Sequence, residues 1–455
     1  MTATRASTNE IVQIEIQRHK QLQNVDVIAF DMDMTLVRYN NPNVIQSVYN
    51  CMIDILQPKF PFLQNKPIDM SFCQRGLVID ITNGYVLKLD NQKRVVKAYF
   101  GNSIVPKETI DKVYHDDTQP LASFTGDMGT RFFSLVSFFE SSSSLIFRDF
   151  SQHLIDESKK TGQPIDNNEF KKMIKVMLEA YNIHFSDFHK GLYYSEFEKN
   201  PGKFIYKAPK EVLSFLLDLK SRGVKTILAT NSISEYTECV MNYSFGENYH
   251  QYFDLVIVQA QKPDFFHGDK PFYYLENHNV KATPDLITSK IQFNTTAMYK
   301  GGNVKCLLEN LAPLLPKPEE PLSFCYVGDN LIGDVVAPKK INWLTIAIIE
   351  EIADPDEVII LKKRQQQKVL VNNGGNSDEE NTPISTNTAS SYEWGSFFHV
   401  HDDHSSLSID SFWAHLIKNN ADIVVPSVFT LAEYFYSDKF DHETLSPCAV
   451  VYGAL

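Results

Sequence analysis

Four clusters of polar side chains each follow a short apolar run in this chain. They are Asp31-Met32-Asp33-Met34-Thr35, Thr230-Asn231-Ser232, Lys262 and Gly328-Asp329-Asn330. Together they supply carboxylates, which can hold a hard cation, and hydroxyl, amide and ammonium groups, which can hold phosphate oxygens. This combination of residue types is typical of phosphoryl transfer.

Asp31 and Asp33 lie two residues apart just after an apolar run, so their carboxylates can face one site together. One can attack phosphorus while the other moves the proton of the leaving group and then activates water. Two neighbouring anions need a cation for this chemistry, and Asp329 offers it a further oxygen ligand. Either acid alone could equally cap a helix or shape a turn, and the other clusters favour chemistry.

The apolar runs before and around these clusters are expected to be strands buried on both faces. They are Val25–Phe30, Val224–Ala229, Phe253–Val258, Leu322–Val327 and Trp343–Ile349. Near-continuous apolar runs of this length are typical of a parallel sheet covered by helices. A helical stripe over Glu211–Arg222, between Pro209 and Gly223, supports this alternation. We predict a doubly wound α/β domain with its ligand at the carboxyl ends of the strands.

The segment between the first two predicted strands is too long for a simple crossover, so we expect a large inserted cap domain. The predicted parts are an N-terminal segment over 1–24, the core over 25–40 and 209–360, the cap over 41–208, a flexible low-complexity loop over 364–391 and a C-terminal segment over 392–455 that packs on the core. Within the cap, Leu77–Leu89 is a predicted hairpin that turns at Asn83-Gly84. Phe132–Phe139 and Glu169–Ala180 are predicted helices. The polar loop lacks the apolar content needed to order it.

The composition restricts the class of partner. The 455 residues are 43% hydrophobic and 22% charged, which is ordinary for a globular protein of two or three folding units. A net charge of −13 argues against nucleic acid or an anionic membrane as partner. The scattered cysteines, without a C-x-x-C pair, indicate a reducing compartment. We expect a cytoplasmic protein without a signal peptide or membrane span, and the sequence leaves a homo-oligomer open.

The clusters resemble, in order, the four motifs of the haloacid-dehalogenase-like phosphatase superfamily. The matching positions are Asp31-x-Asp33-x-Thr35-Leu36, Thr230-Asn231, Lys262 and Gly328-Asp329-x-x-x-x-Asp334. The longer strings FDMDMTLVRY, RGLVIDITNG, LATNS, QKPDFF and YVGDNLIGD are similar to the purine cytosolic 5′-nucleotidase branch and its nucleotidase-domain-containing relatives. The likeness runs from about residue 25 to 350, and more weakly through the aromatic C-terminal part.

This resemblance implies roles for the acidic residues. Asp31 would be the nucleophile that forms an aspartyl-phosphate, and also a metal ligand. Asp33 would be the general acid and base, and would bind the metal through its backbone carbonyl. Asp329 would ligate Mg²⁺, and Asp334 would steer Lys262 or a metal-bound water. A plainer interpretation of Asp334 is an acid at a helix start.

The resemblance also implies that Thr230 and Lys262 grip the phosphate, aided by the amide of Asn231. The plainer alternatives are an N-cap for the next helix at Thr230-Asn231-Ser232 and a solvated loop lysine at Lys262. A helix N-terminus favours anions, so capping and phosphate binding can coexist.

The resemblance is incomplete in the predicted cap. There the family carries a helix with Arg and Asp that ends in His-Tyr-Lys-Gly. The closest match here is Phe188-His189-Lys190-Gly191, and the preceding Ala180–Phe185 has neither Arg nor Asp. Aromatic side chains in this stretch can stack on a base, but the groups that read purine edges are missing. We therefore expect either loose discrimination between bases or a shifted substrate.

The predicted function is hydrolysis of a phosphate monoester through an aspartyl-phosphate with Mg²⁺ as cofactor. The favoured substrate is a purine nucleoside 5′-monophosphate. The alternatives are a phosphatase for another small phosphorylated metabolite, such as a sugar phosphate, and a binding or regulatory protein with little turnover. The complete set of motif residues argues against the binding or regulatory protein, because a site that no longer catalyses has no physical need for both Asp31 and Asp33.

Overall fold

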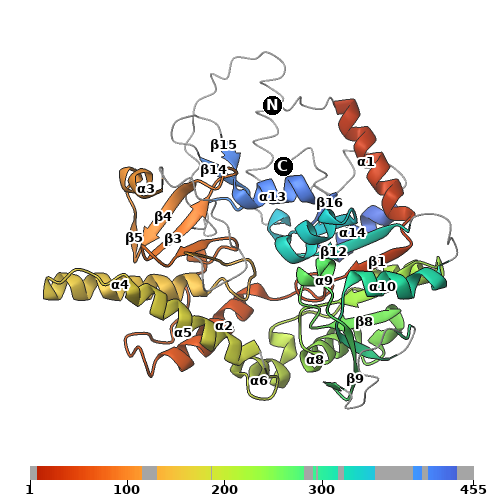
Figure 1. Cartoon of the computed structure of the whole chain (residues 1–455), viewed down its shortest axis with the longest axis horizontal. Coiled ribbons are helices and arrows are strands. Elements are labelled where there is room, and N and C mark those ends of the chain that lie inside the picture. Colours follow the sequence, from red (N-terminus) through yellow and green to blue (C-terminus); the bar gives the residue numbers. More distant parts are fainter. Residues whose placement is uncertain are drawn as a thin grey trace. The chain divides into compact units, whose positions relative to one another are not determined.

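The computed structural model describes residues 8–114, 131–185, 187–280, 291–293, 296–315, 322–353, 393–401 and 408–437. The chain divides into two compact units, each assembled from separate stretches of sequence (Figure 1). Unit 1 comprises Met1–Tyr39, Ile205–Asp354 and Leu416–Leu455, and unit 2 comprises Asn40–Phe204 and Pro355–His415. The loop predicted over 364–391 lies outside the described residues.

Unit 1 is an α/β fold around a mostly parallel sheet. Within the described residues this sheet has nine strands in the order β10-β9-β11-β8-β7-β1-β12-β13-β16. The strands are β1 (Val27–Phe30), β7 (Lys225–Ala229), β8 (Leu255–Val258), β9 (Phe272–Glu276), β10 (Asn279–Val280), β11 (Met298–Gly301), β12 (Phe324–Gly328), β13 (Leu344–Ile348) and β16 (Ile423–Val425). Strand β9 pairs antiparallel with β11 and β10, and the other pairs are parallel. The predicted α/β class with a parallel central sheet is confirmed.

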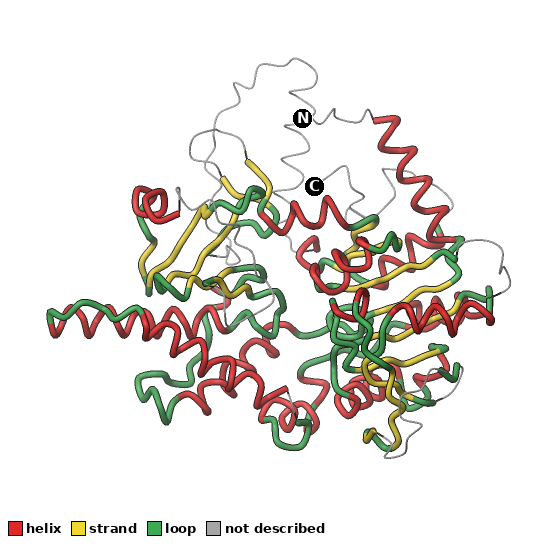
Figure 2. The backbone as a smooth tube through the Cα atoms, viewed as in Figure 1, coloured by secondary structure: helices red, strands yellow, loops and turns green. Residues whose placement is uncertain are grey.

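Helices and helical turns precede, connect and follow these strands (Figure 2). They are α1 (Thr8–Gln23), α7 (Lys210–Ser221), α8 (Ser234–Phe245), η3 (Tyr249–Tyr252), α9 (Asp264–His267), α10 (Val304–Leu311), η5 (Ala312–Leu314), the π-helical turn η6 (Leu331–Val336), α11 (Ala337–Lys340), η7 (Glu350–Ala353) and α14 (Val428–Tyr436), while α13 (Phe412–Asn420) crosses from unit 2 into unit 1. In the part of the chain that the structure describes, no helix has both the length and the apolar character needed to cross a membrane.

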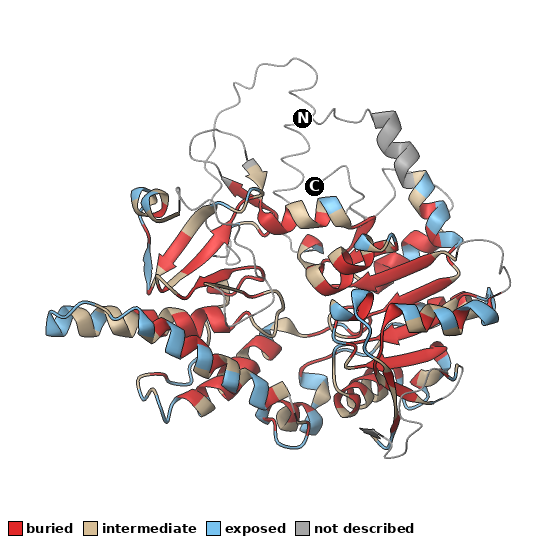
Figure 3. Cartoon of the chain, in the orientation of Figure 1, coloured by how far each residue is buried: buried red, intermediate tan, exposed pale blue. Residues whose placement is uncertain are grey.

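The five strands expected from apolar runs are all present, and they form the buried middle of the sheet (Figure 3). Every residue of β1, β8 and β12 is buried. Strand β1 lies between β7 and β12, with Val27 opposite both Lys225 and Phe324. The apolar side chains on both faces of these strands are covered by helices, as a parallel sheet requires.

Unit 2 contains an antiparallel sheet and a group of helices. Within the described residues the sheet order is β5-β4-β3-β2-β6. The elements are α2 (Asn41–Leu56), η1 (Met70–Phe72), β2 (Val78–Asp80), β3 (Tyr85–Leu89), β4 (Val95–Phe100), β5 (Ser103–Ile104), α3 (Lys107–Tyr114), β6 (Phe132–Ser134), α4 (Ser143–Thr161), α5 (Asn168–Phe185), α6 (Leu192–Lys199), η2 (Pro201–Lys203), β14 (His399–His401) and β15 (Ser408–Asp410).

The local predictions for this unit had mixed outcomes. The hairpin with its turn at Gly84 is confirmed, since β2 pairs with β3 and Gly84 has a φ of 75°. Helix α5 confirms the helix predicted over Glu169–Ala180. The helix predicted at Phe132–Phe139 is wrong, because Phe132–Ser134 form β6 and pair with β2. A short apolar run fits a strand as well as a helix, and only pairing with a distant strand decides.

The C-terminal stretch is divided between the two units. Residues 416–437 belong to unit 1, where β16 pairs with β13 as the expected packing on the core requires, but residues 393–415 belong to unit 2. The Trp394 indole donates a hydrogen bond to the Phe72 carbonyl (3.1 Å), and its ring packs against Phe72 and Tyr99. The buried Lys88 ammonium of β3 donates to the Trp394 carbonyl (2.8 Å). Large aromatic side chains bury enough apolar area to bind this stretch to the unit 2 sheet.

A substitution at Gly76 tests how tightly Trp413 packs within unit 2. Gly76 has a φ of +88°, its carbonyl accepts a hydrogen bond from the Trp413 indole (2.6 Å), and a Cβ there would lie 1.8 Å from the Trp413 Nε1. We expect Gly76→Ala to lower the free energy of unfolding by about 2–3 kcal/mol, because backbone strain and overpacking act together. Urea unfolding measures this.

The control for this prediction is Gly162→Ala. Gly162 also has a positive φ, of +70°, but no atom lies within 4 Å of the added Cβ. This variant should lose only the cost of the left-handed conformation, about 1 kcal/mol. Equal losses for the two variants would show that Trp413 is not tightly packed on Gly76.

Candidate active site

The predicted site residues lie at the carboxyl ends of four neighbouring strands of unit 1. Asp31 directly follows β1, Thr230 follows β7, Asp329 follows β12 and Lys262 lies four residues beyond β8. These strands are adjacent and parallel, in the order β8-β7-β1-β12. The fold therefore brings residues more than 200 positions apart in the chain to one edge of the sheet, where open α/β sheets bind ligands.

The Lys262 ammonium is the centre of this cluster. Its Nζ lies 2.8 Å from Asp31 Oδ1 and 2.7 Å from Asp334 Oδ1. It also donates a hydrogen bond to the Tyr326 hydroxyl (2.9 Å), which itself donates to the Ala229 carbonyl (2.8 Å). Lys262 is buried, so the solvated loop lysine considered from the sequence does not describe it.

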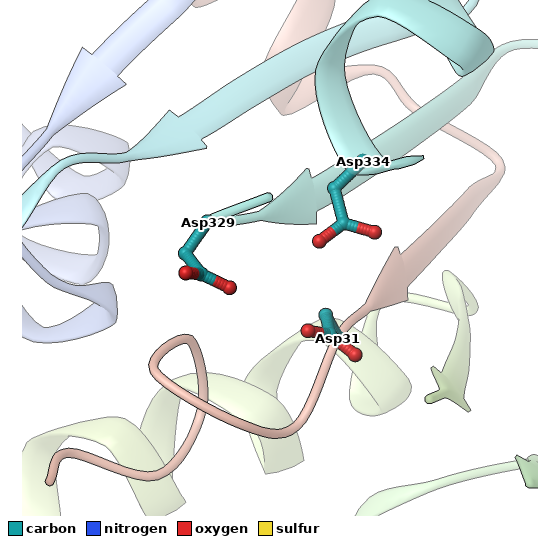
Figure 4. A group of neighbouring side chains, drawn as sticks. All are labelled: Asp31, Asp329 and Asp334. Atoms are coloured by element: carbon teal, nitrogen blue, oxygen red, sulfur yellow. The ribbon is translucent and has the colours of Figure 1, made fainter. Parts of the chain in front are cut away.

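Three buried carboxylates face one another around this point (Figure 4). Oxygen atoms of Asp31, Asp329 and Asp334 all lie within 4.8 Å of one another. Hard divalent cations prefer carboxylate oxygens, and Mg²⁺ needs only one or two of them because it keeps several waters. The carboxylate oxygens of Asp31, Asp329 and Asp334 are therefore suitable ligands for the predicted Mg²⁺.

The turn after β12 places Asp334. Asn330 caps the helical turn η6 with its side chain, which accepts hydrogen bonds from Ile332 N (3.1 Å) and Gly333 N (2.9 Å). The Asp334 carboxylate accepts one from Asn330 N (3.1 Å) and is fully buried. A larger residue would not fit at position 328, because a Cβ on Gly328 would lie 2.3 Å from the Asp334 Cβ. Asp334 thus lies in the first turn of η6, as the plainer interpretation expected, and it is also a buried partner of Lys262.

Asp33 lies in a tight loop after β1, and its side chain contacts the turn between β7 and α8. Met34 has a φ of 56°, and Val37 N donates to the Met32 carbonyl (3.0 Å). Asp33 Oδ2 accepts a hydrogen bond from the Ser232 hydroxyl (2.5 Å), and Oδ1 accepts one from the Tyr39 hydroxyl. Both carboxylate oxygens are therefore held by hydroxyl groups.

Thr230 and Asn231 shape the turn between β7 and α8. The Thr230 hydroxyl accepts a hydrogen bond from Ser232 N (3.1 Å), which is a capping-type contact. The Asn231 side chain accepts from Lys262 N (2.7 Å) and donates to the Lys262 carbonyl (3.1 Å). Asn231 therefore fixes the backbone of the lysine, a contact that the sequence did not reveal.

Comparison with known families identifies the chain. A model of the 5′ nucleotidase family matches residues 14–372, which include every strand end described above. The chain belongs to this family. Its members are phosphoric monoester hydrolases, and the enzyme class predicted from the motifs is confirmed.

Relatives of this 5′ nucleotidase family chain match along most of its length. It is 28% identical to human 5′-nucleotidase domain-containing protein 1 over 444 residues, which cover 93% of each chain. The protein of the same name from Bos taurus is 29% identical over 441 residues, again 93% of each. The rat 5′-nucleotidase domain-containing protein 2 is 27% identical over 340 residues, or 73% of this chain and 58% of the relative.

The site of this family member carries an excess of buried negative charge. Loss of hydration on burial and the neighbouring Asp31 raise the pKa of Asp33 to about 6. Burial also raises the pKa of Asp334 to about 7, although Lys262 opposes the shift. Burial acts to lower the pKa of Lys262, but Asp31 and Asp334 outweigh it and hold this pKa well above its ordinary value. One ammonium does not neutralise these carboxylates, so the cluster is suited to a bound cation.

The aromatic residues of unit 2 that the sequence offered for base stacking largely pack on one another. Phe188 is buried against Tyr194, and Phe185 contacts Tyr181 and Tyr193. His189 is exposed. The hydroxyl groups of Tyr39 and Tyr326 that contact the site were not found from the sequence, since no local pattern distinguishes them from core residues. Ser232 was named with its cluster, but its contact with Asp33 was not predicted.

Proposed function

We propose that this 5′ nucleotidase family member hydrolyses nucleoside 5′-monophosphates with Mg²⁺ through a phosphorylated Asp31. The observation that carries the proposal is the position of Lys262 Nζ between Asp31 and Asp334 beside the Asp329 carboxylate, at the carboxyl ends of adjacent parallel strands. A nucleophile, an acid, a cation for the phosphate and oxygen ligands for a metal are thereby gathered at one sheet edge.

The proposed reaction has two steps, which are the formation and the hydrolysis of an aspartyl-phosphate. An Asp31 oxygen forms a bond to phosphorus while the bond from phosphorus to the ester oxygen breaks, and Asp33 gives its proton to the departing alcohol. Asp33 then takes a proton from a water that attacks the aspartyl-phosphate and releases inorganic phosphate. The raised pKa of Asp33, about 6, suits a group that must both give and accept a proton. Lys262 and Thr230 hold the phosphate oxygens, with the Asn231 amide beside them.

Mg²⁺ would be held by Asp31, Asp329 and the backbone carbonyl of Asp33, as the resemblance implies. When bound, it neutralises charge on the phosphoryl group and orients it for attack. Asp334 keeps Lys262 in place through its 2.7 Å contact. Asp334 is therefore assigned the role of positioning Lys262.

The substrate is proposed to be a nucleoside 5′-monophosphate, in keeping with the names of the relatives, and a purine one because the motifs resemble the purine branch. We further propose that unit 2 is the cap of a haloacid-dehalogenase-like fold. Discrimination between bases is expected to rest on shape, which is typically worth about 1–3 kcal/mol, because the chain lacks the Arg and Asp with which the resembled branch reads purine edges.

Metal dependence and substrate class can be tested together. We expect phosphate release from inosine, guanosine, adenosine and cytidine monophosphates in Mg²⁺, with kcat/KM values that agree within about a hundredfold. EDTA should abolish release and excess Mg²⁺ should restore it. A sugar phosphate in the same panel separates the nucleotide from the other metabolite class. Turnover that is unchanged by EDTA would contradict the metal site, and a far larger kcat/KM for the sugar phosphate would contradict the substrate.

A further inference from the structure

We propose that Tyr39 and Ser232 are positioning residues that hold the Asp33 carboxyl group in line with the leaving group, with Tyr236 supporting Tyr39. This inference rests on the proposed function, in which Asp33 is the proton donor. It adds Tyr39 and Tyr236, which lie outside the four sequence motifs, and it gives Ser232 a contact with Asp33 that the sequence did not predict.

The two hydroxyl groups bind different oxygens of the same carboxyl group. Tyr39 donates to Oδ1 and Ser232 donates to Oδ2 (2.5 Å). One such contact leaves a carboxyl group able to rotate about its Cβ–Cγ bond, whereas contacts to both oxygens fix its plane. Each oxygen keeps a second lone pair, so the group can still carry and deliver a proton.

Burial and contacts with other residues fix the position of Tyr39. Its ring is buried, with 2% of the residue exposed, and its hydroxyl lies 3.1 Å from the hydroxyl of Tyr236 on α8, which is equally buried. Its backbone forms a bridge with Ile205. A phenol that is fixed by packing, backbone pairing and a second phenol can hold Asp33 at little further entropic cost.

Proton donation matters only when the leaving oxygen is strongly basic. The 5′-hydroxyl of a nucleoside must leave protonated, while 4-nitrophenolate leaves as a stable anion. Loss of the Asp33 alignment should therefore slow a nucleoside monophosphate far more than 4-nitrophenyl phosphate. A defect that is merely structural would slow both alike, so the ratio between the substrates separates the two roles.

The experiment compares kcat/KM of the full chain in Mg²⁺ for inosine 5′-monophosphate and 4-nitrophenyl phosphate. This parameter covers the steps up to the first irreversible one, so the later attack of water does not enter. For Tyr39→Phe we expect a loss of about 10- to 100-fold on the nucleotide, a part of what acid catalysis contributes, and less than about threefold on the aryl phosphate. Ser232→Ala should show the same pattern, and Tyr236→Phe a weaker one.

Tyr249→Phe is the matched control. Tyr249 is a buried tyrosine of η3, before the amino end of β8, and its hydroxyl has no hydrogen-bond partner among the described residues. It should leave both substrates unchanged. Circular dichroism and melting curves establish that each variant is folded, and Ser232→Ala decides if Tyr39→Phe does not fold.

Three results would overturn the inference. Equal losses on both substrates would make Tyr39 and Ser232 structural, and unchanged rates on both would make their contacts irrelevant. A wild-type chain that hydrolyses neither substrate would reject the proposed function itself, and the inference would fall with it. Activity of the wild type with unchanged variants rejects the inference alone.

Discussion

Asp31→Asn should abolish turnover while the chain keeps its fold. An amide oxygen is a poor nucleophile and a poorer metal ligand, and losses for a residue central to covalent catalysis reach about 10⁴-fold or more. The side chain keeps its shape, and Lys262 keeps its 2.7 Å contact with Asp334. Phosphate release from inosine 5′-monophosphate measures the loss, and the melting temperature reports on the fold.

Asp264→Asn is the control for this change. Asp264 follows Lys262 by two residues, but its side chain is 60% exposed and pairs only weakly with Lys270 (3.3 Å). The same loss of charge there should change kcat/KM by less than about twofold, since exposed ion pairs contribute little. If Asp31→Asn kept a tenth of the wild-type rate, the covalent mechanism would be wrong.

Lys262→Met should both stop catalysis and destabilise unit 1. The methionine fills a similar volume, but Asp31 and Asp334 lose the buried ammonium that lies within 2.8 Å of each. Removal of one member of a buried ion pair typically costs about 3–5 kcal/mol. The measurement is urea unfolding in EDTA at pH 8, above the pKa of about 7 that Asp334 has beside Lys262 in the wild type.

Mg²⁺ and an exposed lysine provide the controls for this variant. Added Mg²⁺ should recover part of the lost stability, because an ion that binds only the folded state stabilises it by mass action. Lys270→Met, at a lysine whose side chain is 51% exposed, should cost less than about 1 kcal/mol. A Lys262→Met chain as stable as the wild type in EDTA would show that the carboxylates do not depend on this ammonium.

The parallel core and the gathering of the site were predictable from the sequence because the decisive signals are local. Apolar runs identified β1, β7, β8, β12 and β13, and their order along the chain made an α/β sheet the natural arrangement. The carboxyl ends of such strands meet at one edge, so the polar clusters after them had to lie close together. Lys262 lies at that edge, whereas Asp334 was named only from the resemblance, and the roles of both residues stay predictions.

What the sequence did not reveal depends on contacts between distant positions. Phe132–Ser134 form a strand because β2 lies beside them, and Trp394 joins unit 2 because Phe72 and Tyr99 offer it a surface. Tyr39 contacts Asp33 through a hydroxyl group that any core tyrosine carries. Periodicity describes which face of an element is apolar, but it does not say which neighbour will cover that face.

The interleaving of the two units has a consequence for the chain on the ribosome. Strand β1 emerges early, yet its register partner Phe324 is about 300 residues downstream, an interval of about 15–60 s at 5–20 residues per second. Unit 2 can complete its fold only after Trp394 and Trp413 have been synthesised, and unit 1 only after β16 has been synthesised. The apolar strand VIAF has no partner until β7 is made and lacks its second partner until β12 is made. During this interval a chaperone would have the most to protect.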